Sequence, residues 1–190
     1  MENLYNLIIN IINSAGALGN IVDCLLIIME SIIPPLPLGL FITILFVNDG
    51  IIIGFILSYI CTIIGSIISF YLFQTIFKNM VDKYIRKNKL ADKFITLVDN
   101  IKVTDLVLII AIPFTPQFLI NIACGISKVD IKKFLKAILI GKISIVLFWG
   151  LVGTNLIESL IDIYALIKVI ILVSISYIIA RIVNKKYNLN

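Results

Sequence analysis

The sequence predicts an all-α integral membrane protein made of two inverted units, each a re-entrant helical hairpin plus a transmembrane helix, with a closing C-terminal transmembrane helix. Three observations lead to this class. Hydrophobic residues make up 61% of the 190 residues and charged residues 14%, whereas soluble domains are about 45–50% apolar and about 25% charged. Two apolar stretches are interrupted by closely spaced prolines. Lys and Arg are absent from residues 1–77 and cluster beyond them.

The first unit, residues 22–77, contains the first proline break. Apolar runs over residues 21–33 and 38–47 flank the prolines between Pro34 and Pro37. Each run is shorter than the roughly 20 residues that cross a bilayer. A kinked single span and a re-entrant hairpin both fit, and we favour the hairpin because three prolines in four residues interrupt a helix fully. Irregular backbone at membrane depth needs protein or water around it, so the hairpin tip should lie inside the bundle.

The second unit, residues 103–153, repeats this order of elements. A short apolar arm over residues 105–112 ends at a break from Pro113 to Pro116, and a second short arm covers residues 117–126. Both units then have a polar turn and a long apolar span with glycines. Inverted repeats with broken helices that meet at the membrane midplane are typical of transporters.

Charge predicts that the two units have opposite orientations. The first span, residues 51–77, is followed by a basic connector over residues 78–102, whereas the second span, residues 131–153, begins within a basic stretch over residues 128–142. A closing span over residues 167–183 ends in more basic residues. Because basic segments flanking membrane spans stay in the cytoplasm, we expect a multi-pass protein of the bacterial cytoplasmic (plasma) membrane, a single membrane domain over residues 1–190. A short N-terminal helix over residues 3–15 should lie at the membrane surface.

Glu30 is the strongest candidate for a functional side chain. It stands in an apolar run four residues before Pro34, and an acidic side chain inside a membrane is costly enough to indicate function. A proton carrier is one interpretation. An acid that reaches the interface or caps the hairpin backbone is the other.

A second group of candidates lies at the second break. Gln117 and Asn121 share one helix face, and Thr115, Gly125 and Ser127 lie nearby. They could bind a lipid headgroup or hydrogen-bond the first hairpin. We further expect Asp49 and Asp130 to cap helices, Trp149 and Tyr164 to anchor at the membrane interface, and the three cysteines to be separate buried side chains.

The stretch PFTPQFLINIACGISKVDIKKFLKAILIG resembles the signature half of the VTT domain, which defines the DedA and SNARE-associated Golgi protein family. The matching residues are Pro113, Pro116, Asn121, Gly125 and Phe134. MESIIPPLP resembles the early Glu-then-Pro motif of the family through Glu30, Pro34 and Pro37, and GSIISFYLFQ resembles a third family stretch through Gly65 and Phe70. The resemblance covers residues 22–155.

Several charged positions of the family are missing here. Where the family has arginines this chain has Ile110 and Gln74, and where the family has a membrane aspartate it has Ser66. Pro116 also stands at an arginine position of the family, which resembles the shorter SNARE-associated-Golgi-like bacterial branch. The resemblance implies two opposed re-entrant hairpins and movement of a lipid, such as undecaprenyl phosphate or a phospholipid, by a flippase or scramblase. It leaves Glu30 as the only matching acid, which weakens the case for proton coupling.

We therefore expect a transport protein that moves a lipid or amphiphile across the bilayer. A proton- or ion-coupled transporter of a small solute and a non-transporting membrane scaffold are the alternatives. We do not expect an enzyme, because the chain has no histidine, no clustered carboxylates for metal-dependent phosphotransfer and no nucleophile elbow. No metal ion or other cofactor is expected. Membrane lipids are the expected partners, nucleic acid is not, and homo-oligomer formation is left open.

Overall fold

The computed structural model describes residues 16–33, 36–77, 95–96 and 98–187, and these contain six helices of nine or more residues and no strand. The helices are α2 (Gly16–Glu30), α3 (Leu38–Thr75), α6 (Val103–Ala111), α7 (Gln117–Ile126), α8 (Ile131–Glu158) and α9 (Ile163–Tyr187). Three of them, α3, α8 and α9, are long and apolar enough to cross a membrane. This part of the chain confirms the prediction of an all-α membrane protein. The predicted helix over residues 3–15, Pro34 and the basic residues 78–93 lie outside the described residues.

Helix α3 reverses its direction at Gly50. This glycine has φ 78° and ψ 173°, a conformation that side chains other than glycine rarely adopt. Gly54 then packs so closely on the preceding arm that a Cβ there would lie 2.7 Å from the Leu45 carbonyl oxygen. Nine residues of straight helix would separate these positions by about 13.5 Å. Helix α3 therefore consists of a short arm, from Leu38 to the turn, and a long span beyond it.

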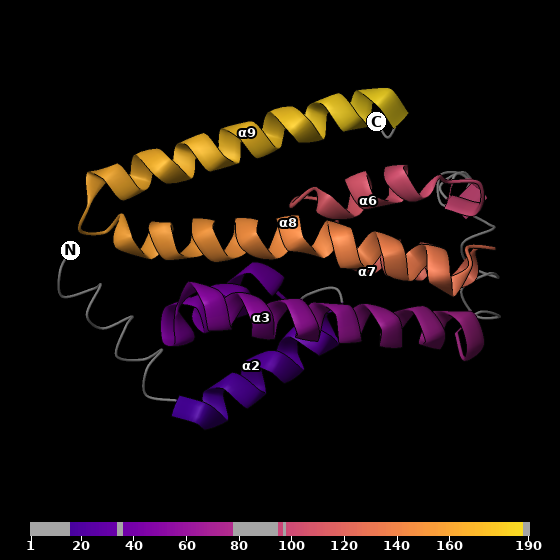
Figure 1. Cartoon of the computed structure of the whole chain (residues 1–190), viewed down its shortest axis with the longest axis horizontal. Coiled ribbons are helices and arrows are strands. Elements are labelled where there is room, and N and C mark those ends of the chain that lie inside the picture. Colours follow the sequence, from indigo (N-terminus) through magenta and orange to yellow (C-terminus); the bar gives the residue numbers. More distant parts are fainter. Residues whose placement is uncertain (1–15, 34–35, 78–94, 97, 188–190) are drawn as a thin grey trace.

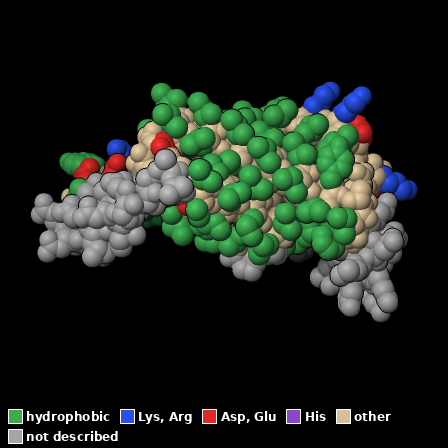
Figure 2. All heavy atoms as spheres, turned by 90° about the horizontal axis from the view of Figure 1, so that it is seen from below, with side chains coloured by type: hydrophobic (Ala, Val, Ile, Leu, Met, Phe, Trp, Pro, Cys, Tyr) green, Lys and Arg blue, Asp and Glu red, His purple; other side chains and the backbone are tan. Residues whose placement is uncertain are grey.

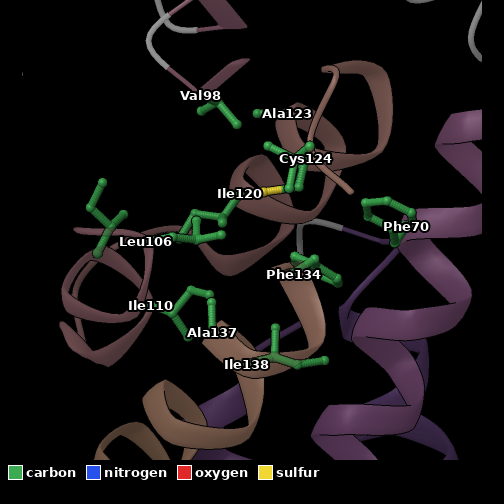
Figure 3. Packing of buried hydrophobic residues seen from close by; sticks show 12 residues of the cluster. Phe70, Val98, Leu106, Ile110, Ile120, Ala123, Cys124, Phe134, Ala137 and Ile138 are labelled. Carbon is green, nitrogen blue, oxygen red and sulfur yellow. The ribbon is translucent and has the colours of Figure 1, made fainter. Parts of the chain in front are cut away.

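The long span of α3 and helix α8 form the centre of the bundle and run in opposite directions (Figure 1). At one end, the rings of Phe70 and Phe134 stack with their centroids 4.9 Å apart. Around them, buried residues of α3, α6, α7 and α8 make one core cluster (Figure 3). At the other end, Gly150 lies against Phe46 of the short arm and Gly153 against Thr43.

The two units repeat at a spacing of 79 residues (113 minus 34). In the first break the Leu36 amide donates to the Ile33 carbonyl at 3.4 Å, and in the second the Thr115 amide donates to the Ile112 carbonyl at 3.2 Å. One turn later, the bond from Leu40 to the carbonyl of Pro37 (3.0 Å) matches the bond from Leu119 to the carbonyl of Pro116 (3.1 Å). All four pairs of equivalent atoms are offset by the same 79 positions, so the two breaks share these backbone hydrogen bonds.

Each hairpin also has a hydrogen bond that joins its two ends. In the first, Asn20 Nδ2 donates to Asp49 Oδ1 at 2.9 Å. In the second, the backbone amide of Lys128 donates to Asp99 Oδ1 at 2.7 Å. These residues again correspond at the 79-residue spacing. In both units the first arm therefore begins beside the turn that follows the second arm.

The outer surface is strongly apolar. Figure 2 shows hydrophobic side chains over the middle of the visible face, with Lys and Arg gathered mainly at one end. Helix α9 packs on α8 and leaves most of its apolar side chains exposed, including Ile170, Ile171 and Ile178. Such a surface is costly in water and suits a surrounding of lipid chains.

Candidate functional site

A cavity of about 650 Å³ lies between the two proline breaks and the second half of α8. Pro37 from the first break and Pro113 and Pro116 from the second all line it, so the structure brings the two breaks together. The wall is mostly apolar, and its polar side chains are Glu30, Thr43, Thr115 and Gln117. The volume lies within the range of about 300–1,000 Å³ that is usual for small-molecule sites.

Glu30 is the last residue of α2 and the acidic side chain of the cavity wall. Only 6% of its surface is exposed, and its Oε2 atom has no hydrogen-bond partner in the described part of the chain. A carboxylate that capped the hairpin would accept hydrogen bonds from backbone amides, and none is present among the described residues. The side chain is therefore available for a ligand or a proton.

Gln117 supports the second break and also contributes to the cavity wall. Its Nε2 atom donates to the carbonyl oxygens of Ile110 at 3.1 Å and Thr115 at 3.3 Å. Ile112 is extended (ψ 120°) because Pro113 follows it, and the interrupted helix leaves carbonyl groups without partners. Gln117 satisfies two carbonyls in this region, so its role is at least partly structural.

Asn121 and Gly125 lie outside the cavity wall and face other helices. Asn121 Nδ2 donates to the carbonyl oxygen of Ser31 in the first break at 3.5 Å. From the sequence, Asn121 could either bind a lipid headgroup or hydrogen-bond the first hairpin, and this contact fits the second interpretation. Gly125 lies against α3, where an added Cβ would be 2.7 Å from the Phe70 carbonyl oxygen. Ser127 donates to the Cys124 carbonyl.

The sequence-based interpretation missed Lys142 as a site residue, because it placed this lysine in the cytoplasmic basic cluster. The structure corrects this. Lys142 is 1% exposed in the interior of α8, and its Nζ atom has no hydrogen-bond partner among the described residues. Its charge interacts with that of Glu30. Its place next to Gly141 in an apolar run, eleven residues into the predicted span, was the signal available in the sequence.

Some smaller expectations also need correction. Asp130 is the N-cap residue of α8, but its side chain makes no capping hydrogen bond. Asp49 bonds Asn20 instead of capping a helix. Trp149 belongs to the cavity wall, where it packs on Gly39 and contacts the ring of Phe114. The thiols of Cys24 and Cys61 interact, so these two cysteines are neighbours.

The described residues contain no group of three or more His, Cys, Asp or Glu side chains that could hold a metal ion. The chemistry of the site therefore depends on one carboxylate, one buried ammonium group and a few neutral polar side chains around an apolar cavity. Such an arrangement can bind a molecule with an apolar part and a charged or polar part.

Comparison with known proteins gives two matches. Residues 33–155 match the family model of the VTT domain. An uncharacterized membrane protein of Bacillus subtilis, YhjE, is 27% identical over 143 residues, which cover 75% of this chain and 69% of that protein. No solved structure matches the chain significantly.

Proposed function

The chain belongs to the VTT-domain family of membrane proteins, and from that premise we propose that it moves a lipid or another amphiphile across the bilayer. Proteins of this kind are linked to membrane transport or lipid handling, and the lipid cargo is our inference. The observation that carries it is the cavity between the two breaks, which has a mostly apolar wall and a buried carboxylate. A headgroup would contact the polar side chains while acyl chains remain against apolar residues.

We propose that both hairpins are re-entrant and meet near the membrane midplane. Helices α2, α6 and α7 have 15, 9 and 10 residues, too few to cross a hydrocarbon core of about 30 Å at about 1.5 Å per residue. The hydrogen bonds Asn20–Asp49 and Asp99–Lys128, which join the ends of each hairpin, support entry and exit on one side. The opposite directions of α3 and α8 support inverted units.

We also propose a multi-pass arrangement in the bacterial plasma membrane, with the basic end in the cytoplasm. Lys132 and Lys136 are exposed at the start of α8, which suits the positive-inside rule. Asp49 would then lie on the outer side. Membrane lipids would be the partners, with no catalytic reaction and no nucleic acid, and self-association stays open.

The orientation can be tested by labelling single cysteines in a background without the three native ones. We expect a membrane-impermeant maleimide to label Asp49→Cys in intact cells, and to label Lys132→Cys only after the membrane is opened. Labelling of both positions from the same side would contradict the inverted arrangement.

Lipid movement can be tested in vesicles that contain the purified full chain. We expect fluorescent phospholipid, scored by a reductant that bleaches only the outer leaflet, to cross faster than in protein-free vesicles. Glu30→Gln should slow this movement by about tenfold or more, while Glu30→Asp should retain part of it. The matched control is Glu158→Gln, an exposed acid at the end of α8, which should leave the rate unchanged.

The same vesicles separate the alternatives. Wild-type vesicles with no faster lipid movement than empty ones would exclude the proposal and favour a scaffold. Lipid movement that requires an imposed proton gradient, and stops in Glu30→Gln, would indicate proton coupling. Undecaprenyl phosphate and phospholipid are the cargoes to compare.

A further inference from the structure

Lys142 is a buried cation that has no role in the transport path proposed above. It lies eleven residues after the first residue of α8, which places it about 16 Å along the helix. Its side chain is 1% exposed, and its Nζ atom has no hydrogen-bond partner in the described part of the chain. A lysine inside a membrane protein is costly unless an opposite charge offsets it.

Glu30 supplies that opposite charge. Helices α2 and α8 run in opposite directions (Figure 1), and Ile27 and Ile145 belong to one core cluster between them. One helical turn beyond Ile27 is Glu30, and one turn before Ile145 is Lys142, so both charged residues lie toward the same end of this cluster. Their charges interact. The span of α3 after Gly50 and helix α7, which pack on this region, carry no charged side chain.

Glu30 and Lys142 make a buried pair of opposite charges, and only its acidic member lines the cavity. Glu30 and Ile145 line the cavity, whereas Lys142 does not. The Oε2 atom of Glu30 and the Nζ atom of Lys142 both lack hydrogen-bond partners among the described residues. The pair therefore depends on charge attraction without a hydrogen bond, which leaves the Nζ donors of Lys142 available to another anion.

We infer that Lys142 determines specificity for an anionic group, the phosphate of a lipid headgroup, which takes the place of the Glu30 carboxylate when cargo enters the cavity. The phosphate oxygens accept hydrogen bonds from Nζ, which satisfies the donors that are unpartnered in the empty site. The mostly apolar cavity wall favours a lipid over free phosphate. This inference rests on the proposed function, because it names the class of lipid that the path selects.

Binding to the purified full chain in detergent tests the inference without transport. The chain contains a single tryptophan, and Trp149 lies in the cavity wall, so its fluorescence reports occupancy. The probes are dihexanoyl phosphatidic acid, dihexanoyl phosphatidylcholine and inorganic phosphate. For the wild type we expect phosphatidic acid to bind about tenfold more tightly than phosphatidylcholine, and inorganic phosphate to bind more weakly than both.

Variants at the ion pair give the decisive comparison. Lys142→Gln should remove the preference for phosphatidic acid while phosphatidylcholine still binds, Lys142→Arg should retain the preference, and Glu30→Gln should increase it because the competing carboxylate is gone. The matched control is Lys136→Gln, an exposed lysine of the same helix. Thermal unfolding of each variant checks that it is folded, and Lys142→Met replaces Lys142→Gln if the amide variant does not fold.

An unchanged lipid preference in folded Lys142→Gln or Lys142→Met would overturn the inference. Inorganic phosphate that binds as tightly as phosphatidic acid, and depends on Lys142, would overturn the assignment to a lipid and indicate a free anion. Failure of the proposed function gives a different result, because wild-type vesicles would then not move lipid even if Lys142-dependent binding were present.

Discussion

The two proline breaks share two backbone hydrogen bonds at the same 79-residue spacing, and the span that follows each break has a glycine that packs on equivalent residues of the first arm. A Cβ at Gly65 would lie 2.9 Å from the carbonyl oxygen of Ile28, and a Cβ at Gly141 would lie 3.1 Å from that of Val107. Ile28 and Val107 are again 79 positions apart. The glycines themselves are 76 positions apart (141 minus 65), so the two spans make the same contact in a register three residues shorter than that of the breaks.

The side chains around the cavity are not shared. Glu30 of the first unit corresponds to Ile109 at the 79-residue offset of the breaks, and Lys142 of the second corresponds to Ser66 at the 76-residue offset (141 minus 65) of the span glycines. Each unit contributes one member of the ion pair, and neither unit contains both. The repeat therefore accounts for the backbone geometry of the two units. The two charged side chains, in contrast, stand at positions where the sequences of the units differ.

The largest effect is expected when the ion pair loses its acid. Glu30→Leu leaves the Lys142 ammonium buried and unpaired, and breaking a buried pair in this way costs about 3–5 kcal/mol. The double variant Glu30→Leu with Lys142→Met removes both charges and should recover most of that loss. Thermal unfolding of the four proteins in detergent measures the coupling. Additive effects of the two substitutions would show that the charges are independent.

Transferring the acid to the other unit sharpens the comparison. Glu30→Ile combined with Ile109→Glu places a carboxylate at the equivalent point of the second hairpin, but Lys142 faces the first. We expect this double variant to lose lipid movement by about tenfold or more and to be no more stable than Glu30→Ile alone. Normal transport by the transferred acid would contradict a requirement for the Glu30–Lys142 pairing.

The glycines of the two spans should differ in sensitivity. In Gly65→Val the new Cβ would lie 2.6 Å from Ser31 Oγ and within 3.0 Å of two backbone atoms of Ile28, which cannot move without displacing α2. In Gly141→Val the nearest atom is Cγ2 of the Ile110 side chain at 2.6 Å. Overpacking of this kind costs about 1–3 kcal/mol, and Gly65→Val should be at the upper end. Adding Ile110→Ala should recover stability in Gly141→Val, and equal losses without recovery would contradict the packing described here.

Helix positions and the two breaks could be predicted from sequence because they depend on local signals. The apolar run between Pro116 and Ser127 predicted the arm over residues 117–126 with the bounds that the structure has. The repeated break followed from proline chemistry alone. These properties require no knowledge of which helices are neighbours.

The partners of polar side chains could not be predicted in the same way. Lys142 belongs by sequence to a basic cluster, and only the folded chain brings its charge within reach of that of Glu30. The same holds for Asn121, whose hydrogen-bond partner Ser31 is 90 positions away. Trp149 was expected at the interface, but the glycine at position 39 leaves space for its ring in the cavity wall.

A smaller effect is expected for the hydrogen bond between the two breaks. Asn121→Leu leaves the buried carbonyl oxygen of Ser31 without its donor, at a cost of about 1–3 kcal/mol, and position 42 of the first unit carries an isoleucine at the equivalent point. Thermal unfolding should place this variant below the wild type and above Glu30→Leu. Because Asn121 lies outside the cavity wall, the Asn121→Leu variant should bind dihexanoyl phosphatidic acid as tightly as the wild type does.

The smallest effect on stability is expected from a crosslink that only the first unit can form. Cys24 of α2 and Cys61 of the α3 span are neighbours whose thiols interact, whereas the equivalent positions of the second unit carry Val103 and Ala137. Diamide should oxidise the two thiols to one disulfide and be reduced to its hydrazine form. Mass spectrometry after alkylation should find a Cys24–Cys61 peptide and unmodified Cys124, and Cys24→Ser should abolish the crosslink. A crosslink that joins Cys124 to either cysteine would contradict the packing of α2 along α3, and with it the placement of Glu30 opposite Lys142.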